Sequence, residues 1–267
     1  MRHSYTIVIL IFVGSVSNDL VSNTNLHISV DSNNSDPTYL LSAFQMTDLA
    51  GTISMLYGIL LHQGAPPRVT GGCSKEKDNE AVPLKLSSHT LNVVAATARL
   101  LHRMVRQHLT AVQEVLGQEG ISLEFRHIAS YLLWYCQAAN NAGNQLSEND
   151  KDNAQLRELL HEVIALVGYF AARHQDNQTI VQSGHRPSVL EQLCNLPFPY
   201  FSQPELKRIL FPTLLACCLE HEENRAILQE EMNWQLIDDF LYSPFENGKN
   251  EHLSTLVLCH DKYRSPR

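Results

Sequence analysis

The sequence predicts an all-α protein built from stacked helical repeats. Apolar residues recur at three- and four-residue spacings through most of the chain, which is typical of amphipathic helices. We find no run of alternating polar and apolar residues that calls for a strand. One stretch also recurs 47 residues further along the chain. We expect the repeat domain at residues 37–242, between a leader with a polar linker at 1–36 and a polar tail at 243–267.

Three helical segments follow from the periodicity. The first is predicted from about Leu49 to Leu61, with Thr47 and Asp48 as candidate caps, and residues 63–83 form a long loop. Ser87 or Ser88 is expected to cap the second, which extends as one helix or a pair to Gly117 or Gly120. The third is predicted from about Leu123 to Asn140, before a polar loop at 141–152.

The composition excludes some classes of function. The chain has 267 residues, of which 44% are hydrophobic and 18% are charged, as in a folded protein. Its formal net charge of -8 argues against direct binding of nucleic acid, which needs clustered Lys and Arg. Of the six cysteines, no pair has the spacing of a zinc ribbon or a redox motif, and we expect buried free thiols.

The first residues resemble a secretory signal. Arg2 and His3 precede an apolar run from Ile7 to Val13, and small residues follow. Residues 1–17 therefore leave a secretory location open as the alternative, and the other interpretation is a buried helix fragment. The run is too short to cross a bilayer, so no transmembrane span is expected. Two glycosylation sequons begin at Asn33 and Asn177.

The internal repeat indicates the architecture. Residues 176–182 align with 223–229, and the same offset pairs His174 with His221. The apolar positions agree as well: Leu159 with Leu206, Val163 with Leu210, Ile164 with Phe211, Leu190 with Ile237, and Leu193 with Phe240. Each predicted unit is a long apolar helix, a short polar turn carrying the Asn, a second short helix and a third. A helical period of this length is typical of armadillo or HEAT repeats, an α-α solenoid.

The repeat turns are the candidate structural sites. We expect the amides of Asn177 and Asn224 to bond backbone groups left free at a helix end. Ile180 and Val181 are expected to begin the next helix, and Gly184 to turn the chain where a Cβ would clash. The full set of predicted repeat-turn residues is Asn177, Ile180, Gln182, Gly184, Asn224, Ile227 and Gln229.

We find no complete catalytic or metal motif. His161–Glu162 begins a metalloprotease pattern, but Ala165 stands where the second ligand belongs. His221 and Glu222 fail in the same way, because Arg225 replaces the ligand. No nucleophile elbow or phosphate loop is present in the sequence. The expectation is a non-enzymatic protein with no cofactor and no metal.

Several framework segments are distinctive. The clearest are Ile180–Gly184, Leu196–Phe198, Tyr200–Ser202 and Leu210–Pro212. The others are Asp36–Thr38, Thr47–Gly51, Met55–Tyr57, Leu123–His127, Leu160–Val163, Gly168–Phe170 and Asp176–Gln178. Together they resemble the C-terminal region of the family of S phase cyclin A-associated protein in the endoplasmic reticulum, over about residues 36–242.

This resemblance implies a cytoplasmic adaptor associated with the endoplasmic reticulum. It implies links to cell-cycle control through the cyclin A complex, and to ribosome-associated decay of tubulin messenger RNA. The family's cyclin-contacting region and zinc-finger-like segment lie upstream of the matching part, so no cyclin-binding residue or metal ligand is carried over. The expected partners are proteins of unknown identity.

Overall fold

The chain folds into helices. The computed structural model describes residues 49–63, 83–141, 150–219 and 221–242, and within these ranges there are helices and no strands. The all-α prediction is therefore confirmed for the described residues. The helices are α3 (Leu49–Leu61), α4 (Ser88–Gln107), α5 (Leu109–Leu116), α6 (Ile121–Asn141), α7 (Asp150–Ala171), α8 (Gln175–Gln182), α9 (Val189–Cys194), α10 (Pro199–Ser202), α11 (Pro204–Cys218), α12 (Glu222–Glu231) and α13 (Gln235–Tyr242).

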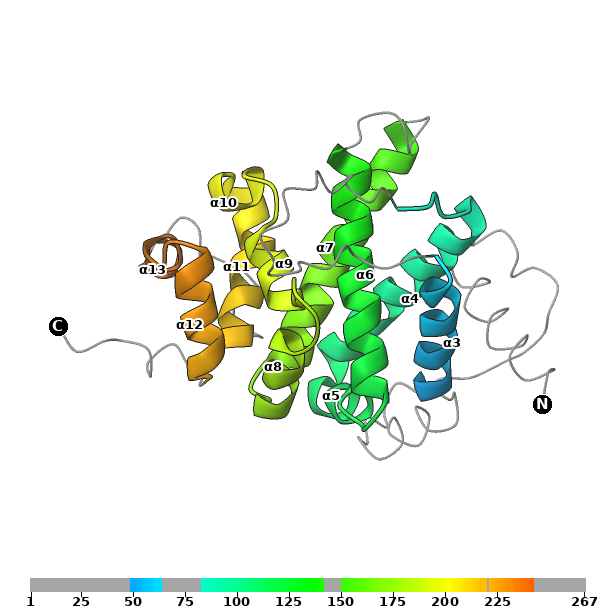
Figure 1. Ribbon diagram of the computed structural model, residues 1–267, viewed down its shortest axis with the longest axis horizontal. Helices are drawn as coiled ribbons and strands as arrows, with labels where there is room; N and C mark the ends of the chain where they lie inside the picture. Colours follow the sequence, from blue (N-terminus) through cyan, green and yellow to red (C-terminus); the bar gives the residue numbers. More distant parts are fainter. Residues whose placement is uncertain (1–48, 64–82, 142–149, 220, 243–267) are drawn as a thin grey trace, which may run out of the picture.

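The helices are stacked along the long axis of the molecule, from α3 near one end to α13 near the other (Figure 1). The long helices α4, α7 and α11 pack side by side, with α7 in the middle. A second layer places α3 against α6 and α6 against α9. A short helix follows each of α4, α7 and α11, so α4–α5–α6, α7–α8–α9 and α11–α12–α13 share one order of elements. This is the unit order that the repeat predicts.

Three positions set the bounds of α4 and α5: a cap before α4, a break between the two helices and a glycine after α5. The Ser87 side chain accepts a hydrogen bond from the backbone N–H of Thr90, which caps α4 as predicted. The apolar stripe then continues to Leu116, but the backbone breaks at His108, so the segment is a pair of helices. α5 ends at Gly117, where a Cβ would lie 2.9 Å from the Asn177 side-chain oxygen.

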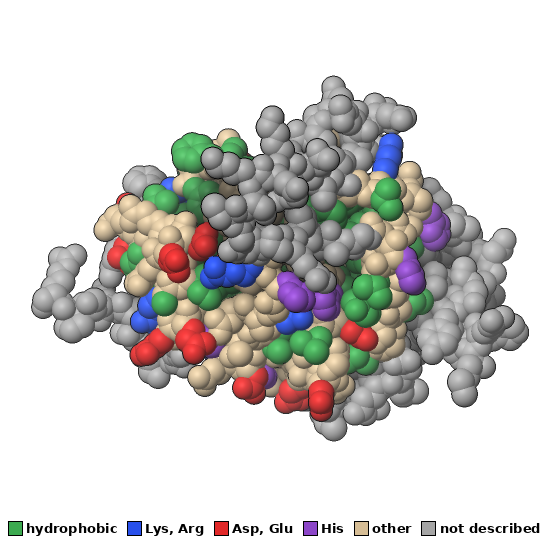
Figure 2. Space-filling model, viewed as in Figure 1, with side chains coloured by type: hydrophobic (Ala, Val, Ile, Leu, Met, Phe, Trp, Pro, Cys, Tyr) green, Lys and Arg blue, Asp and Glu red, His purple; other side chains and the backbone are tan. Residues whose placement is uncertain are grey.

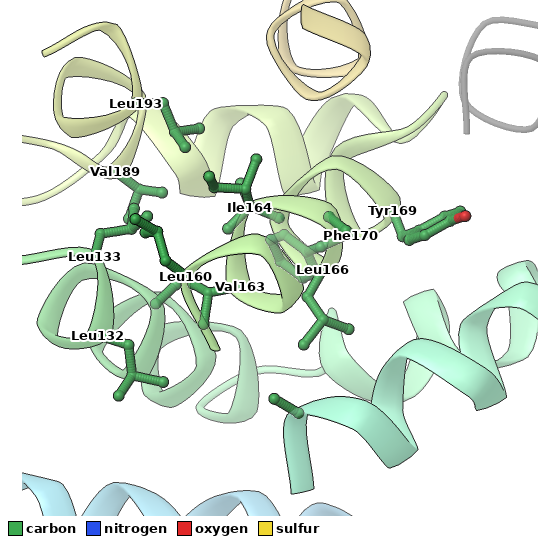
Figure 3. Close-up of a cluster of buried hydrophobic side chains, with 14 of the residues drawn as sticks. Leu132, Leu133, Leu160, Val163, Ile164, Leu166, Tyr169, Phe170, Val189 and Leu193 are labelled. Atoms are coloured by element: carbon green, nitrogen blue, oxygen red, sulfur yellow. The ribbon is translucent and has the colours of Figure 1, made fainter. Parts of the chain in front are cut away.

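α7 is the centre of the hydrophobic core. Every residue from Val163 to Ala172 is buried, because α4, α6 and α11 cover different sides of this helix. Figure 3 shows Leu160 and Val163 pointing toward α6, while Leu166 points toward α4. Each fully buried apolar side chain of this size stabilises the fold by about 1.5–3 kcal/mol. The position of α7 therefore sets the positions of both neighbouring long helices.

The predicted repeat register is visible in the burial of α9 and α13. Leu190 and Ile237 are both fully buried, and so are Leu193 and Phe240. On the long helices, Ile164 and Phe211 are equivalent and fully buried as well. The 47-residue offset therefore pairs residues with the same packing role.

Two details of the predicted unit are wrong. Asn177 and Asn224 do not lie in the turn, because each occupies the third position of a short helix, α8 or α12. Ile180 and Val181 end α8 instead of beginning the next helix. The reason is the histidine before each short helix, whose side chain caps it and starts the helix earlier than the repeat pattern suggests.

Prolines begin two of the later helices. Pro199 is the first residue of α10, and Pro204 is the first residue of α11. The polar loop ends earlier than predicted, since α7 begins at Asp150. The leader at 1–36, the candidate caps Thr47 and Asp48, most of the 63–83 loop and the tail at 243–267 lie outside the described residues.

Gly184 turns the chain at a place where a Cβ would clash, as predicted, and its backbone is also left-handed. Its φ is +101°, in the left-handed region, and a Cβ there would lie 2.9 Å from the Arg126 guanidinium carbon. Gly184→Ala should lower the free energy of unfolding by about 1–3 kcal/mol because of the strained backbone. Chemical denaturation of the two proteins measures this difference.

Gly58 is the matched control. It lies within α3, and a Cβ added there meets no atom within 4 Å. Gly58→Ala should therefore raise the free energy of unfolding by about 0.5–1 kcal/mol, because alanine is the better helix former. Equal effects of the two substitutions would contradict this description of Gly184.

Candidate functional site

The C-terminal end of α7 is buried, and side-chain amides from two other helices bond its free carbonyls. Nε2 of Gln113, on α5, donates to the carbonyls of Tyr169 and Ala172, both at 2.7 Å. Nδ2 of Asn177, on α8, donates to the carbonyl of Phe170 at 2.9 Å. A helix leaves its last carbonyls without backbone partners, and burial removes the water that would otherwise solvate them. We call this set of contacts an amide clamp.

A second amide clamp holds the end of α11, displaced by 47 residues. Gln178, on α8, donates from Nε2 to the carbonyls of Ala216 and Leu219, both at 2.8 Å. Nδ2 of Asn224, on α12, donates to the carbonyl of Cys217 at 2.7 Å and to that of Gln178 at 3.0 Å. Each clamp therefore ties the end of one long helix to two short helices.

Histidines cap the two short helices that contribute the asparagines. Nδ1 of His174 accepts from the backbone N–H of Asn177, and Nδ1 of His221 accepts from that of Asn224. Because Nδ1 of His221 accepts, we assign its proton to Nε2, which lies 3.0 Å from Oγ1 of Thr179 on α8. α12 is thus bonded to α8 through its cap as well as through its clamp.

The remaining predicted repeat residues have different roles. Gln182 donates from Nε2 to Oε2 of Glu223 at 2.8 Å, on the surface between α8 and α12. Ile180 and Ile227 are half-buried against the core, whereas Gln229 is exposed. Asn177 and Asn224 bond free carbonyls at a helix end, as predicted. The two glutamines that complete the clamps, Gln113 and Gln178, were not predicted.

The missed glutamines are both buried, but only Gln113 carries a signal in the sequence. Gln113 and Gln178 are polar side chains with exposed fractions of 6% and 1%. Gln113 lies outside the aligned stretch, and Gln178 is aligned with Arg225, so identity between repeats points to neither. A lone Gln between buried apolar helix positions is the feature that identifies Gln113 from sequence.

The residues of the incomplete metal motifs make structural contacts. Nε2 of His161 lies 3.0 Å from the hydroxyl of Tyr200, and Glu162 is paired with His102 of α4. Within the described ranges, no group of three His, Cys, Asp or Glu side chains could hold a metal ion. The absence of enzymatic activity and of a cofactor remains a prediction.

The described cysteines are free and buried, as expected. Burial raises the pKa of the Cys136 thiol to about 12, and it likewise raises the pKa of Cys218 to about 12. Burial also raises the pKa values of Cys194 and Cys217. These thiols are therefore protonated near neutral pH and poor nucleophiles. Cys73 and Cys259 lie outside the described residues.

The surface carries one unusually exposed aromatic side chain. Four large apolar residues are exposed in the described ranges: Leu61 (54%), Leu84 (65%), Leu123 (45%) and Phe198 (77%). Phe198 directly precedes α10, and hydrophobic side chains cover that part of the surface (Figure 2).

Side chains of α10 anchor the turn that carries Phe198 to α7 and α11. Tyr200 is buried and its hydroxyl contacts His161 on α7, while the ring of Phe201 lies 6.3 Å from that of Phe211 on α11. Pro199 begins the helical turn and is exposed. The fold therefore fixes Phe198 and Pro199 in place without using the Phe198 ring for packing. These two residues, the α10 knob, form the candidate functional site.

The amide clamp allows a direct test. Asn224→Ala removes the donor from the buried carbonyls of Cys217 and Gln178 and should lower the free energy of unfolding by about 1–3 kcal/mol. Gln229→Ala, on the same helix, is the control because Gln229 is exposed, and it should change that energy by less than about 0.5 kcal/mol. Urea denaturation measures both, and equal effects would contradict the clamp.

The described residues also bear on the location of the chain. Within the described ranges, no helix combines the length and apolar character needed to cross a membrane. Asn177 is only 1% exposed and its Nδ2 is bonded, so the folded chain has no room for a glycan at this sequon. The other sequon, at Asn33, and residues 1–17 lie outside the described ranges. The secretory alternative therefore has no support from the residues described.

Comparison with known proteins gives one informative relative. No family model matches the chain. S phase cyclin A-associated protein in the endoplasmic reticulum, from human, is 41% identical over 211 residues, which cover 79% of this chain. The chain spans 13% of the length of that relative. The resemblance predicted for most of the chain is confirmed: over these 211 residues the chain is homologous to S phase cyclin A-associated protein in the endoplasmic reticulum.

Proposed function

We propose that the chain is a non-enzymatic protein-interaction adaptor that binds a partner through the α10 knob. The observation that carries the proposal is the 77% exposure of Phe198 on a turn that Tyr200 and Phe201 anchor. Exposed aromatic side chains are frequent energetic centres of protein interfaces. A rigid support adds to this, because little conformational entropy is lost when the partner binds.

The architecture that supports this role is an armadillo- or HEAT-like solenoid. Three features support the assignment: the repeated order of long, short and third helix, the 47-residue register and the two equivalent amide clamps. Stacked repeats of this kind present extended surfaces to protein partners. The fold alone does not specify a function, so the proposal depends on the exposed residues.

The relative suggests which partners to examine first. Its name associates it with cyclin A and with the endoplasmic reticulum. We propose a related cell-cycle role for this chain, at the cytoplasmic side of the endoplasmic reticulum, and an adaptor role in ribosome-linked decay of tubulin messenger RNA. Direct binding of nucleic acid is not part of the proposal, because the net charge is -8.

The test is purification of the tagged 267-residue chain from cells, followed by measurement of co-purified cyclin A and ribosomal proteins. We expect at least one of these partners with the wild-type chain. Phe198→Asp should reduce its recovery by about tenfold or more, because a charge replaces the apolar contact.

Leu84→Asp provides the control. Leu84 is also an exposed apolar residue, at 65%, but it lies just before α4 and not on the α10 knob. It should leave recovery unchanged, and both variants should unfold within about 0.5 kcal/mol of the wild type. Recovery of neither partner, or equal recovery with Phe198→Asp, would refute the proposal.

A further inference from the structure

A half-buried arginine lies between α6 and the segment that joins α8 to α9. Nη1 of Arg126, on α6, donates to Oγ of Ser183 at 2.7 Å. The guanidinium group lies against Gly184, where a Cβ would be 2.9 Å from both Cζ and Nη1. The positive φ of Gly184 and its missing side chain thus create the space that this group occupies.

The charge of Arg126 has no carboxylate partner among the described residues. Its hydrogen bond goes to the neutral hydroxyl of Ser183, and burial lowers the pKa of Arg126. The carboxylate of Glu191, on α9, is paired with Arg186 at 2.9 Å and also accepts the backbone N–H of Ser188. A guanidinium has five N–H donors, so most of those on Arg126 remain available.

Two histidines lie next to this arginine. His127 follows it on α6, and His185 follows Gly184 in the α8–α9 segment; both are exposed. Partial burial, the charge of Arg126 and the charge of His185 lower the pKa of His127. Figure 2 shows histidine and basic side chains side by side near the middle of this face.

We propose that Arg126, His127 and His185 form a binding site for the phosphoryl group of a phosphorylated protein partner. A planar guanidinium and two imidazoles supply several N–H donors, which suits an anion with three acceptor oxygens. A bound phosphoryl group would pair with the charge of Arg126, which has a hydroxyl and no carboxylate as its partner among the described residues. The inference rests on the proposed protein-binding function but uses a different part of the surface.

A phosphorylated protein fits this surface better than a nucleic acid does. Glu124 lies one helical turn or less from the cluster on α6, where it accepts the hydroxyl of Ser54 at 2.6 Å. The short helices beyond carry exposed Asp176, Glu222 and Glu223. A long polyanion that reached Arg126 would extend past several of these charges, whereas a single phosphoryl group would lie near Glu124 alone.

The experiment uses the 267-residue chain and a Gly-Gly-Ser-Gly-Gly peptide with its serine phosphorylated. NMR follows the imidazole signals of His127 and His185 at pH 7, identified with the variants His127→Gln and His185→Gln. The phosphopeptide should shift both signals in a saturable way. Arg126→Gln should weaken its binding by about tenfold or more, since a charge-assisted contact is lost.

Two controls separate the site from general charge effects. Arg103→Gln, on the exposed side of α4, removes the same charge elsewhere and should leave binding unchanged. His185 is exposed and takes no part in the bond between Arg126 and Ser183, so His185→Gln should weaken binding while its free energy of unfolding stays within about 0.5 kcal/mol of the wild type.

Three results would overturn the proposal. The first is that the phosphopeptide leaves both histidine signals unmoved. The second is that Arg126→Gln binds the phosphopeptide as tightly as the wild type does. The third is that a competing ligand (a peptide with Glu in place of phosphoserine, or a short oligouridine RNA) binds the wild type at least as tightly as the phosphopeptide does. Loss of phosphopeptide binding in Arg126→Gln, with recovery of protein partners through the α10 knob unchanged, would separate the two surfaces.

Discussion

Free carbonyls at the ends of two buried helices are the constraint on which this structure depends. α7 and α11 end inside the molecule, where water cannot solvate their last carbonyls. Gln113 and Asn177 bond those of α7, and Gln178 and Asn224 bond those of α11. An unbonded buried carbonyl costs about 1–3 kcal/mol, so each clamp is comparable to a buried apolar side chain.

The clamps also bond each repeat unit to the next. Each uses side chains from two successive short helices, so a long helix cannot shift without breaking bonds to both of its neighbours. Short helices of eight residues are unstable alone, and here they are fixed by the helix ends that they serve. The rigid frame that results presents Phe198 on one edge and Arg126 between α6 and the α8–α9 segment.

Much of the fold follows from sequence because its strongest signals are periodic. The bounds of α3, the cap at Ser87, the paired burial of Leu190 with Ile237 and the turn at Gly184 were all predictable. The position of Asn177 inside α8 was not, because a histidine cap resembles an ordinary polar turn. Capping by His174 depends on a ring orientation that spacing does not encode.

The candidate sites could not be predicted from the sequence. The exposure of Phe198 depends on how α10 packs, and a Phe between two prolines gives no sign of it. Arg126 and Ser183 are 57 residues apart, and only the contact between α6 and the α8–α9 segment brings them together. The family resemblance covers both regions, but it supplies framework segments and no binding residue.

Native-state hydrogen exchange of the 267-residue chain tests the central claim most directly. If the clamps fix the short helices, the backbone amides in the second half of α8 and of α12 should exchange with the same opening free energy as those of α7 and α11. Exchange of α8 and α12 through local opening, at a free energy several kcal/mol below that of the long helices, would contradict the account.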